Sequence, residues 1–325
     1  MRAVHFCHPG GPDVLKIVEE TVPNIEENEV LIKVKAAGIN RPDIVQREGN
    51  YPAPKGHSKI LGLEVSGIVE KIGKKVKKFS IGDKVAALVN GGGYAEYCKA
   101  NEKVTFKIPK NVSFDEAACI PECFFTAWSN IVNRGGLKKK QKVLIHGGTS
   151  GIGLASIQIA KLFDSIIFTT VGNQEKVNFC KNLGIDKIIN YKKQDFFDFI
   201  KNQNIGGIDV ILDYIGGDYV SKNVNLLNFD GKLINIGFQN GSKVELNLMK
   251  VMLKRLIITG STLRVRDFNF KEKILISLKK NVFPLIENGK IKIFIDSVFK
   301  LDDVVKAHKR LDQGKHIGKI VLKIA

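Results

Sequence analysis

The sequence predicts a two-part protein, in which a β-rich segment comes first, a doubly wound α/β sheet follows, and the chain end returns to the first part. Segments with partial apolar alternation and frequent glycines fill residues 1–110, and a regular succession of strand and helix patterns begins near residue 117. The final apolar segment, GKIVLKI, has no place in that succession. A length of 325 residues also suits two domains rather than one.

The first part, residues 1–118, is expected to form a compact antiparallel β domain. EVLIKVKAAGI (29–39) and LGLEVSGIVEKIG (61–73) mix apolar and charged residues in partial alternation, with glycines typical of bends or bulges. IGDKVAAL and GGYAEYCKA follow and are separated by turn residues.

The second part, residues 119–266, alternates between strand and helix patterns. The strand KVLIHGG precedes helical spacing in IGLASIQIAKLF, and further strands are expected at SIIFTTVG, DKIINY, IDVILDYIGG and GKLINIGF. RLIITGS supplies a sixth strand after an excursion. Strands that alternate with helices in this way predict a doubly wound parallel sheet of the Rossmann type. Residues 267–325 are expected to return to the first part, so the Rossmann domain is an insertion.

The turn HGGTSGIG (146–153) joins the first of these strands to its helix and predicts a dinucleotide site. Glycines at 148, 151 and 153 let a ligand approach the backbone, and the N-terminus of the following helix suits a pyrophosphate. A purely structural turn is the alternative, which the following βα units disfavour. Short-chain dehydrogenases have a similar turn, but their Tyr-x-x-x-Lys occurs here only from Tyr51 to Lys55, upstream and interrupted by prolines.

The end of the second strand of this sheet points to NADPH rather than NADH. It reads TTVGN and contains no acid that would accept the ribose hydroxyls of NAD, while Lys176 follows Gly172 and Asn173 by one helical turn. A 2′-phosphate fits this pattern, and Tyr191 after the third strand is expected to flank the same phosphate or the adenine. Lys176 as a solvated helix lysine is the structural alternative.

The composition disfavours several other classes of protein. Lysine supplies nearly all of the net charge of +18 and is spread along the chain, whereas nucleic-acid readers concentrate Arg and Lys on one face; weak polyanion binding stays open. We find no apolar run long enough to span a bilayer and no signal-peptide core in MRAVHFCHPGG, so the expected location is the cytoplasm. Five scattered cysteines indicate reduced thiols and argue against structural zinc.

Several segments together resemble the medium-chain dehydrogenase/reductase superfamily, and within it the zeta-crystallin quinone oxidoreductases. They are GINRPDIVQREGNYP (38–52), ILGLEVSGIV (60–69), GGGYAEY (91–97), IPECFFTAW (120–128), HGGTSGIG (146–153), NYKK (190–193) and HIGKIVL (316–322). The chain is most similar to the tumour-suppressor-inducible branch, over essentially its whole length. The resemblance implies a GroES-like catalytic domain beside the Rossmann domain, and an NADPH-dependent, zinc-free reductase that forms a homodimer.

The zinc-free expectation is tested on two positions. Zinc alcohol dehydrogenases of this superfamily present a Cys in the loop that reads GINRPD here, and a Gly-His-Glu motif where this chain has Gly62-Leu63-Glu64. Because both positions lack Cys or His, no metal site is expected. Reduction of an electrophilic acceptor then suits the chain better than oxidation of a simple alcohol.

The resemblance also implies where the acceptor and the cofactor bind. Asn40 and Tyr51 would line the acceptor pocket and stabilise negative charge on the acceptor oxygen; a turn role for Asn40 and a packing role for Tyr51 are the alternatives. The implied cofactor residues are Thr126 at the nicotinamide, Ser150, Gly151 and Ile152 at the pyrophosphate, and Ile215, Gly216, Phe238, Leu263 and Arg264 at carboxyl ends of strands, with Lys315 as a weaker candidate. His146 and Cys123 are expected to be structural.

The predicted function is therefore NADPH-dependent reduction of quinones or other activated carbonyl acceptors. One alternative is a reductase of enoyl thioesters or enones, in which Tyr51 would matter more as a proton donor. Another is a non-catalytic protein that binds NADPH and RNA. For the homodimer, RLIITGST (255–262) either pairs edge to edge across a two-fold axis or has a covered edge.

Overall fold

The computed structural model describes residues 1–185 and 187–324 and divides into two compact units. The first unit contains residues 1–125 and 263–325, and the second unit contains residues 126–262. These boundaries lie at 125/126 and 262/263, where the sequence analysis places them at 118/119 and 266/267. Residue 186, which begins the expected strand DKIINY, lies outside the described residues. Residue 325, the last of the expected segment 267–325, also lies outside them.

The first unit is built on a seven-stranded sheet and a separate two-stranded sheet. In the large sheet β14, β15, β3, β4, β5 and β7 are neighbours in that order, and β6 pairs with β3; β1 pairs with β2. The strands are β1 (Arg2–His5), β2 (Lys16–Glu19), β3 (Glu29–Ile39), β4 (Glu64–Ile72), β5 (Lys84–Leu88), β6 (Tyr97–Asn101), β7 (Thr105–Lys107), β14 (Ile295–Lys300) and β15 (Lys319–Lys323).

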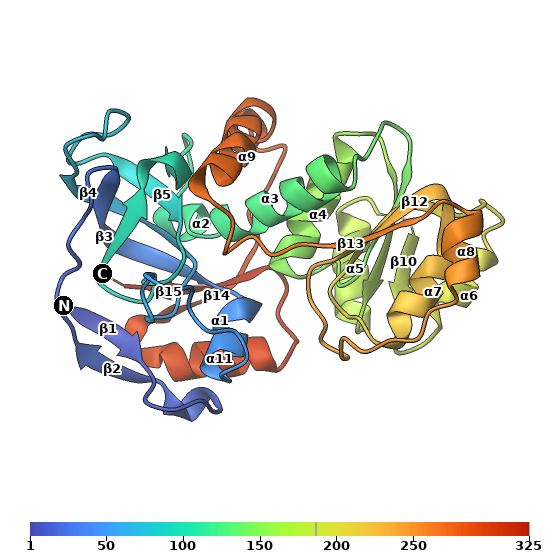
Figure 1. Cartoon of the computed structure of the whole chain (residues 1–325), viewed down its shortest axis with the longest axis horizontal. Coiled ribbons are helices and arrows are strands. Elements are labelled where there is room, and N and C mark those ends of the chain that lie inside the picture. The colour runs from blue at the N-terminus through green and yellow to red at the C-terminus, as the bar shows by residue number, and fades with distance from the viewer. Residues whose placement is uncertain (186, 325) are drawn as a thin grey trace. The chain divides into compact units, whose positions relative to one another are not determined.

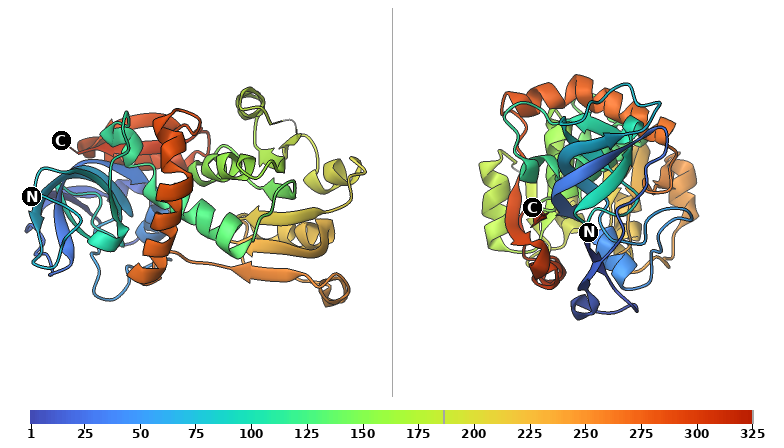
Figure 2. Two further views of the ribbon diagram at one scale, coloured as in Figure 1. Left: turned by 90° about the horizontal axis from the view of Figure 1, so that it is seen from above. Right: turned by 90° about the vertical axis from the view of Figure 1, so that its left-hand side faces the viewer.

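The end of the chain returns to this sheet, as the sequence predicts. β15 pairs antiparallel with β3, so that Ile320 lies opposite Ile39 and Lys323 lies opposite Ala36. Figure 1 and Figure 2 show the red C-terminal strands beside the blue N-terminal ones. Residues from opposite ends of the sequence therefore complete one sheet, and the second unit is an insertion in the first.

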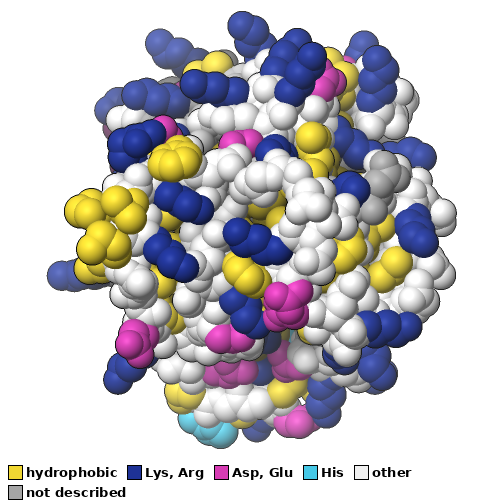
Figure 3. Space-filling model, turned by 90° about the vertical axis from the view of Figure 1, so that its right-hand side faces the viewer, with side chains coloured by type: hydrophobic (Ala, Val, Ile, Leu, Met, Phe, Trp, Pro, Cys, Tyr) yellow, Lys and Arg dark blue, Asp and Glu magenta, His cyan; other side chains and the backbone are white. Residues whose placement is uncertain are grey.

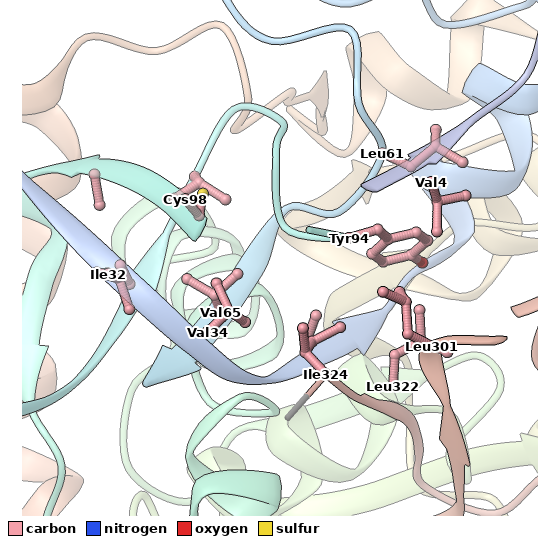
Figure 4. Packing of buried hydrophobic residues seen from close by; sticks show 14 of the residues in the cluster. Val4, Ile32, Val34, Leu61, Val65, Tyr94, Cys98, Leu301, Leu322 and Ile324 are labelled. Carbon is pink, nitrogen blue, oxygen red and sulfur yellow. The ribbon is translucent and has the colours of Figure 1, made fainter. Parts of the chain in front are cut away.

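The core of the first unit lies where these strands converge (Figure 4). The side chains of four residues are fully buried there: Ile32 and Val34 of β3, Val65 of β4 and Leu322 of β15. Ile32 and Val34 are two residues apart and therefore share one face of β3, but β3 is buried along most of its length, so the partial alternation of its sequence does not mark an exposed face. The polar ring edge of Tyr94 joins this apolar cluster.

Helices of the first unit flank the sheet. α1 begins directly after β3 because the carboxylate of Asp43 accepts the amide of Asn40 at 2.8 Å, which caps the helix start. Residues 268–287 form two helices, since Val282 ends one helix and precedes another. The helices are α1 (Arg41–Arg47), α2 (Phe114–Ala117), α3 (Pro121–Ala127, which spans the first boundary), α9 (Phe268–Asn281), α10 (Phe283–Glu287) and α11 (Val304–Asp312).

The second unit contains the predicted parallel sheet. Its order is β10, β9, β8, β11, β12, β13, and every neighbouring pair is parallel. The order in which the chain adds strands to the sheet changes direction between β8 and β11. In open sheets of this kind, ligands bind at this position. The strands are β8 (Lys142–Ile145), β9 (Ile166–Val171), β10 (Lys187–Asn190), β11 (Ile208–Asp213), β12 (Leu227–Asn235) and β13 (Ile257–Gly260).

Helices connect these strands (Figure 1). Four begin at residues whose side chains accept a backbone amide of the first turn: Ser150, Asn173, Asp195 and Asn247. The helix α7 ends at Leu226, and β12 begins at the next residue. The helices are α4 (Gly151–Lys161), α5 (Gln174–Asn182), α6 (Phe196–Lys201), α7 (Asp218–Leu226), α8 (Leu248–Leu253) and a π-helix (Trp128–Arg134).

Two apolar clusters cover the faces of this sheet. One contains residues of β8, β9, α4 and α5, and the other contains residues of β11, α6 and α7. A sheet that is buried on both faces explains why its strands are continuous apolar runs rather than alternating ones. None of the described helices combines the length and the apolarity needed to cross a bilayer.

Candidate active site

The glycine turn after β8 is held in a tight conformation by its neighbours. Gly147 has φ +62°, and a Cβ on it would overlap the hydroxyl of Tyr214. That hydroxyl donates to the Gly147 carbonyl at 3.1 Å, and Gly147 N donates to the Thr170 hydroxyl at 3.1 Å. A Cβ on Gly153 would likewise overlap the Gly147 carbonyl. The turn therefore needs glycine at both positions.

The start of α4 presents backbone amides beside this turn. Ser150 caps the helix: its hydroxyl accepts Gly153 N at 3.0 Å, and its carbonyl accepts Leu154 N at 2.8 Å. Gly151 and Ile152 occupy the first helical positions, whose N–H groups lack partners within a helix. Because the positive end of the helix dipole lies here, the turn suits a pyrophosphate, as predicted for these three residues.

The residues predicted to contact the ribose phosphate come together at the end of β9. Gly172 lies against Tyr191, since a Cβ on the glycine would be 2.6 Å from the tyrosine hydroxyl. The side-chain oxygen of Asn173 accepts Lys176 N at 2.8 Å, so α5 begins at this point. Tyr191 is 46% exposed, whereas the side chain of Lys176 is largely buried. The paired strands β9 and β10 thus bring the residues that follow them together.

The loop after β11 carries Ile215 and Gly216, and both amides are already used. One oxygen of the buried Asp213 carboxylate accepts Ile215 N at 2.7 Å and Gly216 N at 3.3 Å. Their backbone conformation is therefore fixed by Asp213, which the sequence analysis did not single out. Phe238 is 48% exposed and touches Gly216, since a Cβ there would be 2.8 Å from its ring.

Thr126 belongs to a polar network of the second unit. Its carbonyl accepts the amide of Asn130 at 2.9 Å, the Ser261 hydroxyl donates to the Asn130 side-chain oxygen at 2.6 Å, and Ser261 N donates to the Asn235 carbonyl at 3.1 Å. At both ends of this network a buried oxygen has no partner among the described residues: Thr126 Oγ1 and Asn235 Oδ1. Buried polar atoms normally have partners, so these two atoms fit a polar ligand group.

In the first unit, Asn40 adjoins a buried ion pair. The Lys319 ammonium lies 2.7 Å from Glu64 Oε1 and donates to Asn40 Oδ1 at 2.6 Å and to the Ile39 carbonyl at 2.7 Å. Glu64 is fully buried, and Lys319 is 6% exposed. Burial lowers the pKa of Lys319, but the Glu64 carboxylate outweighs it and the net shift is upward. Lys319 is therefore a buried cation held by its ion pair with Glu64.

This ion pair fixes the orientation of the Asn40 amide. Its nitrogen donates to Glu64 Oε1 at 2.9 Å and to the Gly38 carbonyl at 3.3 Å, while its oxygen accepts from Lys319. An amide nitrogen has two protons, and both face these oxygens. Asn40 therefore has a positioning network that the sequence analysis missed, and its predicted role toward the acceptor stays a prediction.

Tyr51 lies under a guanidinium group. The Arg264 guanidinium carbon is 5.3 Å from the centre of the Tyr51 ring, and two of its nitrogens donate to the Asn90 carbonyl at 3.0 and 2.7 Å. Lys271 donates to the Asn90 side-chain oxygen at 2.8 Å and to the Arg264 carbonyl at 2.9 Å. Burial lowers the pKa of Lys271 to about 8 and raises that of Tyr51 above its ordinary value.

Glu122 adds an acid that the sequence analysis did not single out. It follows Pro121 at the start of α3, and its backbone N–H donates to Glu64 Oε2 at 2.8 Å. Burial, with a contribution from Glu64, raises its pKa from 4.5 to about 7. The fully buried Asp43 has its pKa raised by burial to about 6, and it accepts the hydroxyl of Tyr94 at 3.0 Å.

Other candidates lie apart from these groups or serve the fold. His146 is fully buried, and its ring nitrogens face Thr170 Oγ1 at 3.2 Å and Asn223 Oδ1 at 2.9 Å, in line with the structural role expected for it. Cys123 is 2% exposed, and burial raises its pKa to about 12. Leu263 begins the second segment of the first unit, and Lys315 is exposed. Within the described residues, no three His, Cys, Asp or Glu side chains are grouped as metal ligands would be.

Comparisons with known proteins extend over the whole chain. The family model of the alcohol dehydrogenase GroES-like domain matches residues 26–110, and the model described as zinc-binding dehydrogenase matches residues 183–322. A quinone oxidoreductase of Lama guanicoe is 33% identical over 327 residues, which cover 99% of this chain and 97% of that protein.

Solved structures are similar along their full length. The quinone oxidoreductase of Escherichia coli complexed with NADPH is 27% identical with a TM-score of 0.89, and each chain is covered completely. The CurK enoyl reductase is 26% identical with a TM-score of 0.85, and 100% of this chain and 99% of that chain are covered.

Proposed function

Since the chain belongs to the quinone oxidoreductase family of the medium-chain dehydrogenase/reductase superfamily, we propose that it is an NADPH-dependent quinone oxidoreductase. Its substrates would be quinones or other activated carbonyl acceptors, reduced without zinc. The observation that carries the proposal is the Lys319 ammonium, 2.6 Å from Asn40 Oδ1 and 2.7 Å from Glu64 Oε1. This ion pair holds Asn40, the residue predicted to line the acceptor pocket, in a single orientation.

The residues at this centre do not fit the zinc ion that the name of one matching family model implies. A catalytic zinc needs about three protein ligands of the Cys, His or carboxylate type. Asn40 and Leu63 stand at the two expected ligand positions, and Glu64 is engaged by an ammonium and an amide. We therefore assign no step to a metal.

The second unit has the features that NADPH requires. The amides at the start of α4 would bind the pyrophosphate, and Asn173, Lys176 and Tyr191 would surround the 2′-phosphate at an acid-free strand end. Thr126 Oγ1 and Asn235 Oδ1 have no partner among the described residues and fit the polar edge of the nicotinamide. NADPH when bound supplies a hydride to the acceptor.

The first unit supplies the groups for the acceptor. Tyr51 lies beside the Arg264 guanidinium, whose positive charge would favour a developing oxyanion. Asn40 is held rigidly by Lys319 and Glu64 with both amide protons already bonded, so it would line the pocket while Arg264 and Tyr51 face the oxyanion. Low exposure of these polar groups strengthens their electrostatic effect on the acceptor.

Loss of NADPH absorbance with a panel of acceptors tests this proposal. The panel contains p-benzoquinone, phenanthrenequinone, a short enone and an enoyl-CoA, each repeated with NADH. We expect turnover with a quinone and a strong preference for NADPH. Turnover with the enoyl-CoA alone would instead favour the second candidate, an enoyl thioester reductase, which the similarity to the CurK enoyl reductase supports. Tight NADPH binding without any turnover would contradict both.

We also propose a homodimer formed through β13. This strand ends the six-stranded order, and Ile257 on it is 48% exposed. The nearby helix α8 exposes Leu248, Met249, Met252 and Leu253, each by at least 57%. An open strand edge with exposed apolar residues suits pairing across a two-fold axis. Light scattering of the wild type and of Ile257→Lys tests this, since the variant should be monomeric.

The distribution of basic residues supports catalysis over RNA binding as the main role. Figure 3 shows Lys and Arg side chains scattered over one face and interspersed with acids, rather than gathered in one stripe. Salt-sensitive retention of RNA by the purified protein would contradict this preference.

A further inference from the structure

We propose that Glu122 is the proton donor of the acceptor half-reaction, a buried carboxylic acid that gives its proton to the reduced acceptor and regains one from water. This inference rests on the proposed function, because it assigns a step that follows hydride transfer. No sequence motif pointed to this residue beyond its place in IPECFFTAW.

The geometry places Glu122 beside the Asn40 centre. The Glu64 carboxylate accepts one hydrogen bond from each of the two residues. Its Oε1 accepts from Asn40 Nδ2 at 2.9 Å, and its Oε2 accepts from the backbone nitrogen of Glu122 at 2.8 Å. Glu64 is fully buried and is also paired with Lys319, so this link is rigid. The start of α3, which carries the Glu122 side chain, is thereby fixed to the residue predicted to line the acceptor pocket.

The Glu122 carboxyl group has no structural use that would explain its burial. It is 9% exposed, and within residues 1–185 and 187–324 it makes no side-chain hydrogen bond and no ion pair. Acids are rarely buried unless they are paired, because an ionised carboxylate loses its hydration. A buried and unpaired acid beside a polar centre is therefore a candidate for proton transfer.

The charges around Glu122 leave it able to hold and release a proton near neutral pH. Burial is the largest influence and raises its pKa to about 7, Glu64 and Asp43 raise it further, and Lys319 and Lys271 oppose them. On the other side Glu122 interacts electrostatically with Tyr51, Arg264 and Cys123. A general acid works best when its pKa lies close to the working pH.

The other polar groups of the first unit are less suited to this step. Both amide protons of Asn40 face Glu64 and Gly38. Burial raises the pKa of Tyr51 above that of an ordinary phenol, which makes it a weaker acid. The Lys271 ammonium donates to Asn90 and to the Arg264 carbonyl and is 1% exposed.

The proposed step is balanced with NADPH as the reductant. The hydride brings two electrons to the acceptor, which becomes an enolate or a hydroquinone anion, while NADPH becomes NADP⁺. The O–H bond of Glu122 then breaks, and a C–H bond forms at the α-carbon of an enone, or an O–H bond forms at a quinone oxygen. Water reprotonates the carboxylate before the next turnover. The step matters most for an enone, because carbon protonation is slower than oxygen protonation.

The test compares wild type with Glu122→Gln, which has nearly the same shape and no acidic proton. Turnover is measured at saturating NADPH from about pH 5.5 to 9, with a short enone and with p-benzoquinone. We expect the wild-type kcat for the enone to fall above about pH 7, and the variant to lose roughly 10²-fold at pH 6 and to show no such fall. The loss with p-benzoquinone should be smaller, and KM for NADPH should not change.

Two further variants make the result specific. Glu70→Gln removes an exposed glutamate of the same unit and should leave both profiles unchanged. Glu122→Asp retains an acid and should recover part of the enone activity together with its pH dependence, which a purely structural role would not produce.

Each result decides between the inference and the proposed function. A Glu122→Gln enzyme that keeps the wild-type kcat and pH profile with the enone would overturn the inference alone. A wild-type protein that reduces no acceptor would overturn the proposed function and this step with it. If the Gln variant does not fold, Glu122→Met, which also lacks the acidic proton, serves instead, and a wild-type kcat and pH profile of that variant with the enone would overturn the inference.

Discussion

Replacing Lys319 by methionine should destabilise the first unit strongly. The Lys319 ammonium lies 2.7 Å from Glu64 Oε1, and Glu64 is fully buried. Methionine has a similar length but no charge, so the Glu64 carboxylate would lose its counter-ion and keep only the donors from Asn40 and Glu122. Removing one partner of a buried ion pair costs about 3–5 kcal/mol, because the other charge stays buried without compensation.

Urea unfolding measures this loss, and a double variant identifies its cause. Lys319→Met combined with Glu64→Gln removes both charges and should recover most of the stability, since a neutral replacement of a buried pair is often tolerated. Far-ultraviolet circular dichroism would follow the transition, because the single tryptophan, Trp128, lies in the second unit. A single variant that loses less than about 1 kcal/mol, or a double variant no more stable than the single one, would refute the ion-pair reasoning.

Three other predictions concern the cofactor site and the buried acid. Gly147→Ala should abolish NADPH binding in a fluorescence titration and lower stability by about 1–3 kcal/mol, whereas Gly241→Ala, also at positive φ but in open space, should keep binding. Lys176→Ala should raise KM for NADPH by roughly tenfold or more and leave KM for NADH unchanged. Lys181→Ala, on the same helix, is the control and should change neither KM. An equal effect of Lys176→Ala on both cofactors would contradict its assignment to the 2′-phosphate. The pKa of Glu122 is 4.5 in the unfolded chain and about 7 in the folded protein, so between these pH values only the folded protein holds the proton. The free energy of unfolding should therefore fall by up to about 3 kcal/mol as the pH rises through this range. Urea unfolding at pH 5 and 8 measures this fall, which Glu122→Gln should lack.

The sequence predicts those features that depend on local pattern. β3 has the bounds that its alternating segment indicates, from Glu29 to Ile39, and the six strands of the second unit occur in the expected order. The return of GKIVLKI to the first sheet is also confirmed. These predictions succeed because strand periodicity and glycine turns are encoded within a few residues.

Features that depend on distant contacts are not visible in the sequence. Lys319 stands in a strand far along the chain from Glu64, and only the register of β15 on β3, with Ile320 opposite Ile39, brings it to that carboxylate. The Asp213 carboxylate similarly fixes the Ile215 amide, which the sequence analysis assigned to the cofactor. Glu122 could have drawn attention as an acid inside the apolar run IPECFF, but its burial is a property of the tertiary structure.

The position of β15 has a consequence for the synthesis of this protein. The residues of the second unit are complete once residue 262 has been made, whereas the sheet of the first unit still needs β15, which follows the whole second unit in the chain. Lys319 lies in that strand, so the charged partner of Glu64 is synthesised after the second unit. A chain that stopped before β15 would therefore contain every strand of the nucleotide unit but no counter-ion for Glu64.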